Sequence, residues 1–266
     1  MQVVELKQIR QALASVDLLE EVAAGFVAYS RGEAVVPPVG ELTFEDPPGD
    51  VHIKYGCLRG GKSYVIKIAS GFYDNPKRGL PSSNGMMLVF DQKTGEPRAV
   101  LLDEGYLTDV RTAAAGALAG RCLAPRPVRR IGVLGTGIQA RLQVEYLQQV
   151  TDCCSVTAWG RSRESLERYR DDMTAQGFEV ETTLDAGEVA AACNLIVTTT
   201  PSTAPLLRAE QIRRGTHLTA MGSDTAGKQE NQRLWDELNE LTGVVNVNLV
   251  FADVDDSTES HRHVDG

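Results

Sequence analysis

The chain has 266 residues, and its 27 Lys plus Arg against 36 Asp plus Glu give a formal net charge of −9. This length predicts one large domain or two moderate ones with a sizeable core. The acidic balance argues against general nucleic-acid binding, and no apolar run approaches the ~20 residues that span a bilayer. The five cysteines show no C-x-x-C spacing. We therefore expect a cytoplasmic chain with reduced cysteines, without a metal, nucleic-acid or membrane partner.

Residues 1–124 predict an α+β domain. Apolar residues recur at helical spacing from about 6 to 31, where Arg31-Gly32 ends the pattern. Short β-type runs follow at 51–56, 63–70, 85–91 and 98–104. Because short Gly-, Asn- and Pro-rich loops connect them, we expect a mostly antiparallel sheet. A helix dense in alanine is expected over 110–122, with Thr108-Asp109 as its cap.

From residue 129 onward, apolar strands alternate with helices, which predicts a parallel, doubly wound sheet. The proline-rich stretch 124–128 precedes this change, and we place a domain boundary after residue 124. The expected fold class is therefore α/β, with a second domain over 125–230.

The sequence Gly135-Thr136-Gly137-Ile138-Gln139-Ala140 is a G-x-G-x-x-A fingerprint between an expected strand and an expected helix. The first glycine permits a tight turn, the second lets a pyrophosphate approach, and the alanine keeps helix and strand close. Backbone N–H groups at the helix start then face the anionic pyrophosphate. In this context the motif predicts a Rossmann-type dinucleotide site made by these six residues. The alternative is a glycine turn that serves packing only.

The next expected strand ends in Arg161-Ser162-Arg163, without an acidic residue at its tip. NAD enzymes usually carry Asp or Glu there for the ribose 2′-OH, whereas arginine accommodates a 2′-phosphate. We therefore expect NADP over NAD, with Ser162 as a further donor. The alternative is a pair of solvated arginines at a helix start. Thr198 and Thr199 end a later strand near the expected nicotinamide, and either contact the cofactor or only fill the strand.

Five separated segments carry a further pattern. They are YVIKIASGFYDNP, GLPSSNGMMLVFDQKTG, LTDVRTAAAGALA, IGVLGTGIQA and AMGSDTAGKQE. Together and in this order they resemble the ornithine cyclodeaminase/mu-crystallin family over residues 1–230. The resemblance implies a Rossmann NAD(P)-binding domain over 125–230, a substrate-binding and dimerisation domain over 1–124, and a homodimer. The family includes ornithine cyclodeaminases, alanine dehydrogenases, ketimine reductases and thyroid-hormone-binding crystallins.

Carried over by position, Lys67 and Arg111 match the family's ligands for the substrate carboxylate, and Lys67 counts also as catalytic. Arginine can bind a carboxylate through two hydrogen bonds, and lysine adds a compact charge. Asp224 matches the aspartate that acts as acid or base in the enzymes, and the crystallins lack it. The alternatives are that Lys67 faces water on a strand, that Arg111 forms an ordinary salt bridge on a helix, and that Asp224 caps a loop.

The chain departs from the family pattern at one substrate position. Cyclodeaminases carry a further substrate arginine in the segment that matches about residues 36–44, and this chain has none there. His52 and Lys54 are two apart and so share one face of a strand, which makes them candidates to bind a second acidic group. Their segment VHIKYG is similar to the iminosuccinate-reductase branch, whose product is aspartate. A solvent-facing pair is the alternative.

Residues 231–266 depart more widely. They hold eight acids and two bases, and so carry −6 of the net charge. They do not match the strand, acidic loop and returning helix with which family members continue, and we assign them as an acidic tail unmatched to the family.

The resemblance implies NAD(P)H-dependent reduction of an imine of a 2-oxo acid, with iminosuccinate as the specific candidate. Lys67 and Arg111 hold the α-carboxylate, His52 and Lys54 the distal acid, and Asp224 moves the proton in this hypothesis. Three alternatives remain open. They are an ornithine cyclodeaminase that makes proline and ammonia with bound NAD, an NADP-dependent binding protein like the crystallins, and an inactive truncated copy.

Overall fold

The computed structural model describes residues 1–72, 74–202 and 204–221. By its contacts the chain divides into two compact units, and the division falls between Thr108 and Asp109, near the start of helix α3 (Tyr106–Leu123). Asp224 and the predicted acidic tail lie outside the described residues. The domain limits expected from the sequence, with a boundary after residue 124, stay a prediction.

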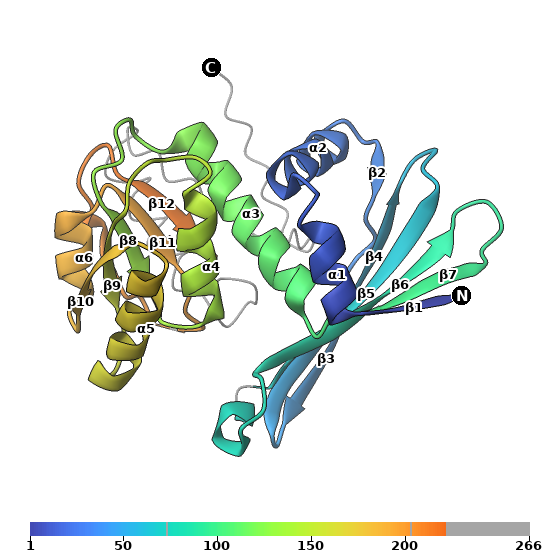
Figure 1. Ribbon diagram of the computed structural model, residues 1–266, viewed down its shortest axis with the longest axis horizontal. Helices are drawn as coiled ribbons and strands as arrows, with labels where there is room; N and C mark the ends of the chain where they lie inside the picture. Colours follow the sequence, from blue (N-terminus) through green and yellow to red (C-terminus); the bar gives the residue numbers. More distant parts are fainter. Residues whose placement is uncertain (73, 203, 222–266) are drawn as a thin grey trace. The chain divides into compact units, whose positions relative to one another are not determined.

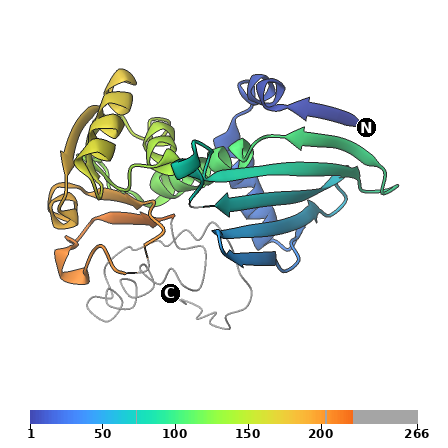
Figure 2. The same ribbon diagram turned by 90° about the horizontal axis from the view of Figure 1, so that it is seen from below.

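The first unit is built on a largely antiparallel sheet. Its described part has seven strands in the order β1-β7-β6-β5-β4-β2, with β3 also paired to β4. The strands are β1 (Gln2–Glu5), β2 (Ala34–Val35), β3 (Gly40–Glu45), β4 (Pro48–Leu58), β5 (Ser63–Phe72), β6 (Ser83–Asp91) and β7 (Pro97–Leu102). Neighbours run antiparallel, except that β1 is parallel to β7. Figure 2 shows these strands side by side.

Two helices follow β1 where the sequence pattern predicts one helical stretch. They are α1 (Leu6–Leu13) and α2 (Leu18–Ser30), and Figure 1 shows both on the same side of the sheet. The break has a local cause. The side chain of Asp17 accepts a hydrogen bond from the Glu20 N–H at 3.2 Å, and so caps a new helix. A short 3₁₀ helix, η1 (Asn75–Arg78), lies between β5 and β6.

The second unit contains a parallel sheet whose described strands run in the order β10-β9-β8-β11-β12. These strands are β8 (Ile131–Leu134), β9 (Ser155–Trp159), β10 (Glu179–Thr183), β11 (Leu195–Thr198) and β12 (His217–Ala220). The connecting helices are α4 (Ile138–Leu147), α5 (Arg163–Ala175), α6 (Ala186–Ala192) and the 3₁₀ helix η2 (Ala209–Gln211). Strand order runs outward from β8 in both directions, which is the doubly wound topology of a Rossmann fold. The predicted fold class is confirmed.

Helices cover both faces of this parallel sheet (Figure 1). Along β8, Ile131 and Val133 pack in a buried cluster with α4 and α5, whereas Leu134 packs with α6 and η2. The alternation follows from the two-residue period of a strand. Helix α3 lies on the α4 side, since a Cβ at Gly120 would come within 2.9 Å of the Leu147 side chain. The carboxyl ends of the central strands meet at one edge, where such folds bind ligands.

Within the described ranges, no helix has the length and apolar character that crossing a membrane requires. The same ranges hold no group of three or more His, Cys, Asp or Glu side chains placed to bind a metal ion. All five cysteines are free thiols, and burial raises the pKa of Cys193 to about 11.

Candidate functional site

The predicted dinucleotide turn lies between β8 and α4, at the carboxyl edge of the parallel sheet. Gly135 has a φ of 127°, and a Cβ there would lie 2.4 Å from the Thr199 Oγ1, so a side chain is excluded. Gly137 is the N-cap of α4 without a side-chain cap, and a Cβ there would meet nothing within 4 Å. Open space therefore coincides with the N–H groups of a helix start, which suits a pyrophosphate.

The remaining residues of the turn divide between the cofactor side and the core. Ala140 is fully buried, as close packing of helix and strand requires, and Ile138 is 54% exposed. Gln139 is the second residue of α4, and its side-chain amide donates to the carbonyl oxygen and to the Oδ1 of Asp109, both at 3.1 Å. The backbone of Gln139 is thus available to a phosphate, while its side chain is turned to α3.

Arg141 is a residue of this turn that sequence reasoning missed. Its Nη1 donates to the carbonyls of Thr136 at 2.6 Å and Gly137 at 3.1 Å. Since C=O and N–H of one trans peptide point in opposite directions, this directs the N–H groups of Gly137 and Ile138 away from Arg141. Asp172 on α5 fixes the guanidinium at 2.7 Å. Arg141 and Asp172 are 31 residues apart in the sequence, so no local motif predicts their contact.

The tip of β9 lies against the same turn. A Cβ at Gly160 would come within 2.8 Å of the Thr136 side chain, so the two loops touch. Arg161 and Arg163 follow directly and are exposed. The Ser162 hydroxyl caps α5 by accepting a hydrogen bond from the Ser165 N–H at 3.3 Å. The arginines therefore stand beside the phosphate turn, while Ser162 already has a structural role.

The two threonines at the end of β11 differ in role. Thr199 donates from its Oγ1 to the Leu134 carbonyl at 3.1 Å and packs against Gly135, so it supports the phosphate turn. Thr198 is 3% exposed, and its Oγ1 has no hydrogen-bond partner among the residues that the structure describes. A buried hydroxyl of this kind, at the carboxyl end of a central strand, fits the neighbourhood of a bound cofactor.

A row of basic residues lies on one face of the sheet in the first unit. Lys54 on β4 and Lys67 on β5 are directly opposed cross-strand partners. His52, two residues before Lys54, shares their face and is paired with Ala69. We call His52, Lys54 and Lys67 the basic row. The strand spacing expected for His52 and Lys54 is present, and β5 adds Lys67 to it.

The residues beside the basic row differ along its length: Lys67 is paired with Met87 on β6, whereas His52 has small and acidic neighbours. Ala69 is paired with Gly85 on β6, so two small residues continue the line that begins at His52. The His52 Nε2 lies 3.6 Å from the Asp50 Oδ1, and both side chains are largely buried, with 17% and 16% exposed. The small residues therefore lie at the His52 end of the basic row, where Asp50 is close enough to orient the imidazole.

Arg111 is half-buried in α3 and belongs to the second unit. The helix begins at Tyr106, earlier than the predicted cap at Thr108-Asp109. The reason is Asp103, whose Oδ2 accepts a hydrogen bond from the Leu107 N–H at 2.9 Å. Asp103 is only 1% exposed, and its Oδ1 has no hydrogen-bond partner within the described ranges. The longer helix places Arg111 in its second turn rather than at its start.

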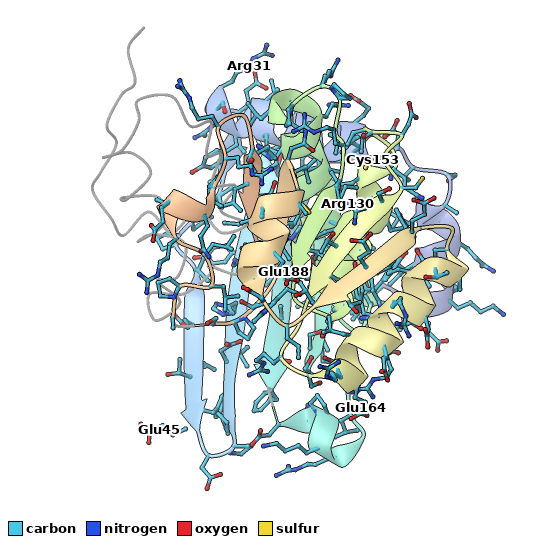
Figure 3. All side chains as sticks on the ribbon, turned by 90° about the vertical axis from the view of Figure 1, so that its left-hand side faces the viewer. Arg31, Glu45, Arg130, Cys153, Glu164 and Glu188 are labelled. Carbon is cyan, nitrogen blue, oxygen red and sulfur yellow. The ribbon has the colours of Figure 1, made fainter. Side chains whose placement is uncertain are left out.

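A cavity of about 600 Å³ opens elsewhere in the second unit and is lined by residues such as Arg129, Cys153 and Leu195. Figure 3 shows Arg130 and Cys153 towards one edge of the parallel sheet and Glu164, at the start of α5, towards the other. Glu164 marks the carboxyl edge with the phosphate turn, because it follows the end of β9. The cavity is therefore at the amino edge and is distinct from the dinucleotide turn.

The geometry defines a Rossmann-type chain that carries an additional α+β domain with a basic row on its sheet. The family model for the ornithine cyclodeaminase/mu-crystallin family matches residues 1–240. The chain belongs to the ornithine cyclodeaminase/mu-crystallin family.

Curated relatives are longer than this chain. A relative from Rhizobium meliloti is 43% identical over 206 residues, which make up 77% of this chain and 63% of the relative. The iminosuccinate reductase of Paracoccus denitrificans is 31% identical over 235 residues, 86% of this chain and 71% of that protein. The chain thus spans about two thirds of the length of the curated relatives it matches.

Solved structures show the same architecture. An archaeal alanine dehydrogenase dimer with bound NAD is 31% identical, with a TM-score of 0.78 over 86% of this chain and 70% of that one. The Δ1-pyrroline-2-carboxylate reductase of Thermococcus litoralis, solved with NADH and L-proline, is 26% identical. Its TM-score is 0.76 over 83% of this chain and 68% of that one.

Proposed function

We propose that this protein binds NAD(H) or NADP(H) and reduces the C=N bond of a 2-imino acid to an amino acid. The observation that carries the proposal is a phosphate turn at a Rossmann carboxyl edge in a chain that also holds opposed lysines, Lys54 and Lys67. When bound, the nicotinamide supplies the hydride that the imine carbon accepts. Relatives support this chemistry, since they include an iminosuccinate reductase and a pyrroline-2-carboxylate reductase.

Lys67 and Arg111 hold the α-carboxylate of the substrate in this proposal. Lys67 is in the middle of β5, where a charged side chain is unusual for a strand of otherwise apolar character. Arg111 offers the planar guanidinium that pairs with both oxygens of a carboxylate. By fixing the carboxylate, the two residues orient the imine carbon for hydride transfer.

Lys54 and His52 hold a second acidic group, which makes a dicarboxylate such as iminosuccinate the proposed substrate. Lys54 and Lys67 are directly opposed strand partners, so their side chains lie on the same face of the sheet and two carboxylates of one ligand can pair with them. A monocarboxylate needs one of these cations, whereas a dicarboxylate uses both. His52 adds a donor on the same face, oriented by Asp50 at 3.6 Å.

Proton transfer to the substrate nitrogen is assigned to Asp224, on the basis of the family motif alone. Asp224 follows β12 by four residues and lies outside the described residues. An Asp224→Asn variant retains the size of the side chain but cannot donate a proton. We expect it to bind cofactor normally and to lose turnover.

Cofactor choice in this proposal follows Arg161 and Arg163, which stand exposed at the tip of β9 beside the phosphate turn. No acidic residue occupies the tip, so the proposed preference is NADP(H). The pyrroline-2-carboxylate reductase and the alanine dehydrogenase described above were solved with NADH and NAD, so the proposed preference distinguishes this chain from them. The ratio of the NADPH to the NADH dissociation constant should rise about tenfold in Arg161→Gln.

A homodimer formed through the first unit is part of the proposal. Among the described residues, the large apolar side chains that are exposed lie mostly in this unit, and only Leu123, Ile138 and Leu184 lie in the second. A concentration of exposed apolar side chains in one unit suits an interaction surface there. The archaeal alanine dehydrogenase was solved as a dimer, which supports the assignment.

Initial-rate assays test the proposal. Purified protein is mixed with NADPH or NADH, oxaloacetate and ammonia, and the loss of cofactor absorbance is followed. We expect oxidation that depends on both oxaloacetate and ammonia, with pyruvate as a poorer partner. A protein that binds the cofactor but does not oxidise it with any combination of 2-oxo acid and amine would contradict the proposal. Proline and ammonia formed from ornithine, without net change in NADH, would decide for the cyclodeaminase instead.

A further inference from the structure

Helices α3 and α4 of the second unit are joined by two glutamine side chains. Gln139 donates to the carbonyl oxygen and the Oδ1 of Asp109, both at 3.1 Å. Gln143 donates to the carbonyl oxygen of Thr112 at 3.1 Å and to the Oε1 of Gln139 at 3.3 Å. We call these four linked residues the amide ladder.

The amide ladder anchors one face of α3. Asp109, Thr112 and Gly116 follow each other at spacings of three and four residues, and so lie on the same side of the helix. A Cβ at Gly116 would come within 1.9 Å of the Gln143 Oε1, so glycine makes room for a glutamine that is fully buried. Arg111 lies between the two anchored residues and projects from a different side of the helix.

Gln139 therefore has two contacts of different kinds. Its backbone N–H belongs to the first turn of α4, where such groups have no partner within the helix and face a bound pyrophosphate. Its side chain holds Asp109, two residues before Arg111. A backbone movement that closes the phosphate turn also moves the atoms that hold the start of α3.

We propose that Gln139 is a positioning residue that couples dinucleotide binding to the placement of Arg111. The coupling rests on the proposed function in one respect, namely that Arg111 binds the substrate carboxylate. It separates Gln139 from Gly135 and Gly137, whose role is to shape the turn for the pyrophosphate. Loss of its side-chain hydrogen bonds should weaken the binding of a carboxylate substrate while the affinity for the dinucleotide stays nearly constant.

Hydrogen–deuterium exchange tests the coupling without any turnover. NADPH and NADH are added in separate samples, and exchange is followed for the fingerprint turn and for residues 109–113. In the wild type, both segments should exchange at least about threefold more slowly with cofactor bound. In Gln139→Leu, the fingerprint turn should still be protected, but residues 109–113 should not respond. A wild type whose residues 109–113 do not respond to either cofactor overturns the coupling.

A pair of substitutions that first adds a negative charge at residue 139 and then removes the one at residue 109 tests the hydrogen bond itself. Gln139→Glu places a carboxylate next to the Asp109 carboxylate, so the hydrogen bond from the side-chain amide is lost and the two negative charges repel each other. The oxaloacetate KM at neutral pH should rise by about tenfold or more relative to the wild type. Adding Asp109→Asn restores an amide–carboxylate pair and should reverse most of this rise.

The control is Gln149→Glu, which adds the same charge at an exposed position just beyond α4. It should leave the KM unchanged. A Gln139→Glu variant with a weakened NADPH affinity and an unchanged oxaloacetate KM would show a direct cofactor contact and overturn the proposal. If no imine is reduced at all, the proposed function fails, whereas the exchange experiment still decides the coupling.

Discussion

Lys54 on β4 and Lys67 on β5 are directly opposed partners on two antiparallel strands. Their two ammonium-bearing side chains therefore lie on the same face of the sheet in the first unit. Two positive charges on one face of the sheet suit an anion that carries two carboxylates. This relationship is the basis for proposing a dicarboxylic imine as the substrate.

Replacing Lys54 by glutamine should change substrate preference more than it changes chemistry. The variant loses the charge proposed for the distal carboxylate but keeps Lys67, so the KM for the imine of oxaloacetate should rise about tenfold to a hundredfold. The KM for the imine of pyruvate should stay within about threefold, and kcat should change little. Steady-state kinetics with both 2-oxo acids measure this. Lys93→Gln, in an exposed turn, is the control, and an equal effect on both substrates contradicts the assignment.

Arg141 should control cofactor affinity through the backbone. Because Arg141 orients the peptide groups of Thr136 and Gly137, its replacement by glutamine should weaken NADPH and NADH binding by about tenfold. Fluorescence titration measures the two dissociation constants. Arg170→Gln, in which an exposed arginine on α5 is changed, is the matched control. Unchanged affinity in Arg141→Gln would show that the turn keeps its geometry without this side chain.

Two glycine-to-alanine changes in helices should act with opposite signs. Gly116→Ala drives a methyl group into the Gln143 side chain and should lower the free energy of unfolding by about 1–2 kcal/mol. Gly25→Ala in α2 meets nothing within 4 Å, so it should raise the stability by about 0.5–1 kcal/mol. Urea unfolding measures both. A Gly116→Ala protein as stable as the wild type would mean that α3 and α4 can separate without loss.

His217 should make the protein less stable in mild acid. Burial lowers the pKa of His217 from 6.5 to about 4, so the folded state holds a neutral imidazole. As the pH falls below 6.5, His217 binds a proton in the unfolded chain but not in the folded chain. The free energy of unfolding therefore decreases until about pH 4. By pH 5 the loss is about 2 kcal/mol. His217→Asn should show a smaller decrease between pH 7.5 and pH 5 in urea unfolding, and an identical decrease contradicts this origin.

The sequence predicts the Rossmann half well because its signals are local. The alternation of apolar strands with helices and the Gly135-to-Ala140 motif each lie within one short stretch. The site's supporting contacts are not local. Arg141 meets Asp172 after 31 residues and Gln139 meets Asp109 after 30, and neither pair has a sequence signature.

Strand register limits prediction in the first unit. A one-residue slip reverses the face of every side chain, so the opposition of Lys54 and Lys67 cannot be read from their spacing. The start of α3 differs from the predicted start because the side chain that caps it lies outside the helical pattern. Asp103 comes directly after β7, within the stretch 98–104 that the sequence predicts as a strand.

The most direct test of the central claim is label transfer. NADPH or NADH deuterated at nicotinamide C4 is incubated with the protein, oxaloacetate and ammonia, and the product is analysed by mass spectrometry. Imine reduction predicts L-aspartate with one deuterium at Cα, because the hydride adds to the imine carbon and the nitrogen takes a proton. Labelled malate, unlabelled aspartate or no amino acid at all would contradict it.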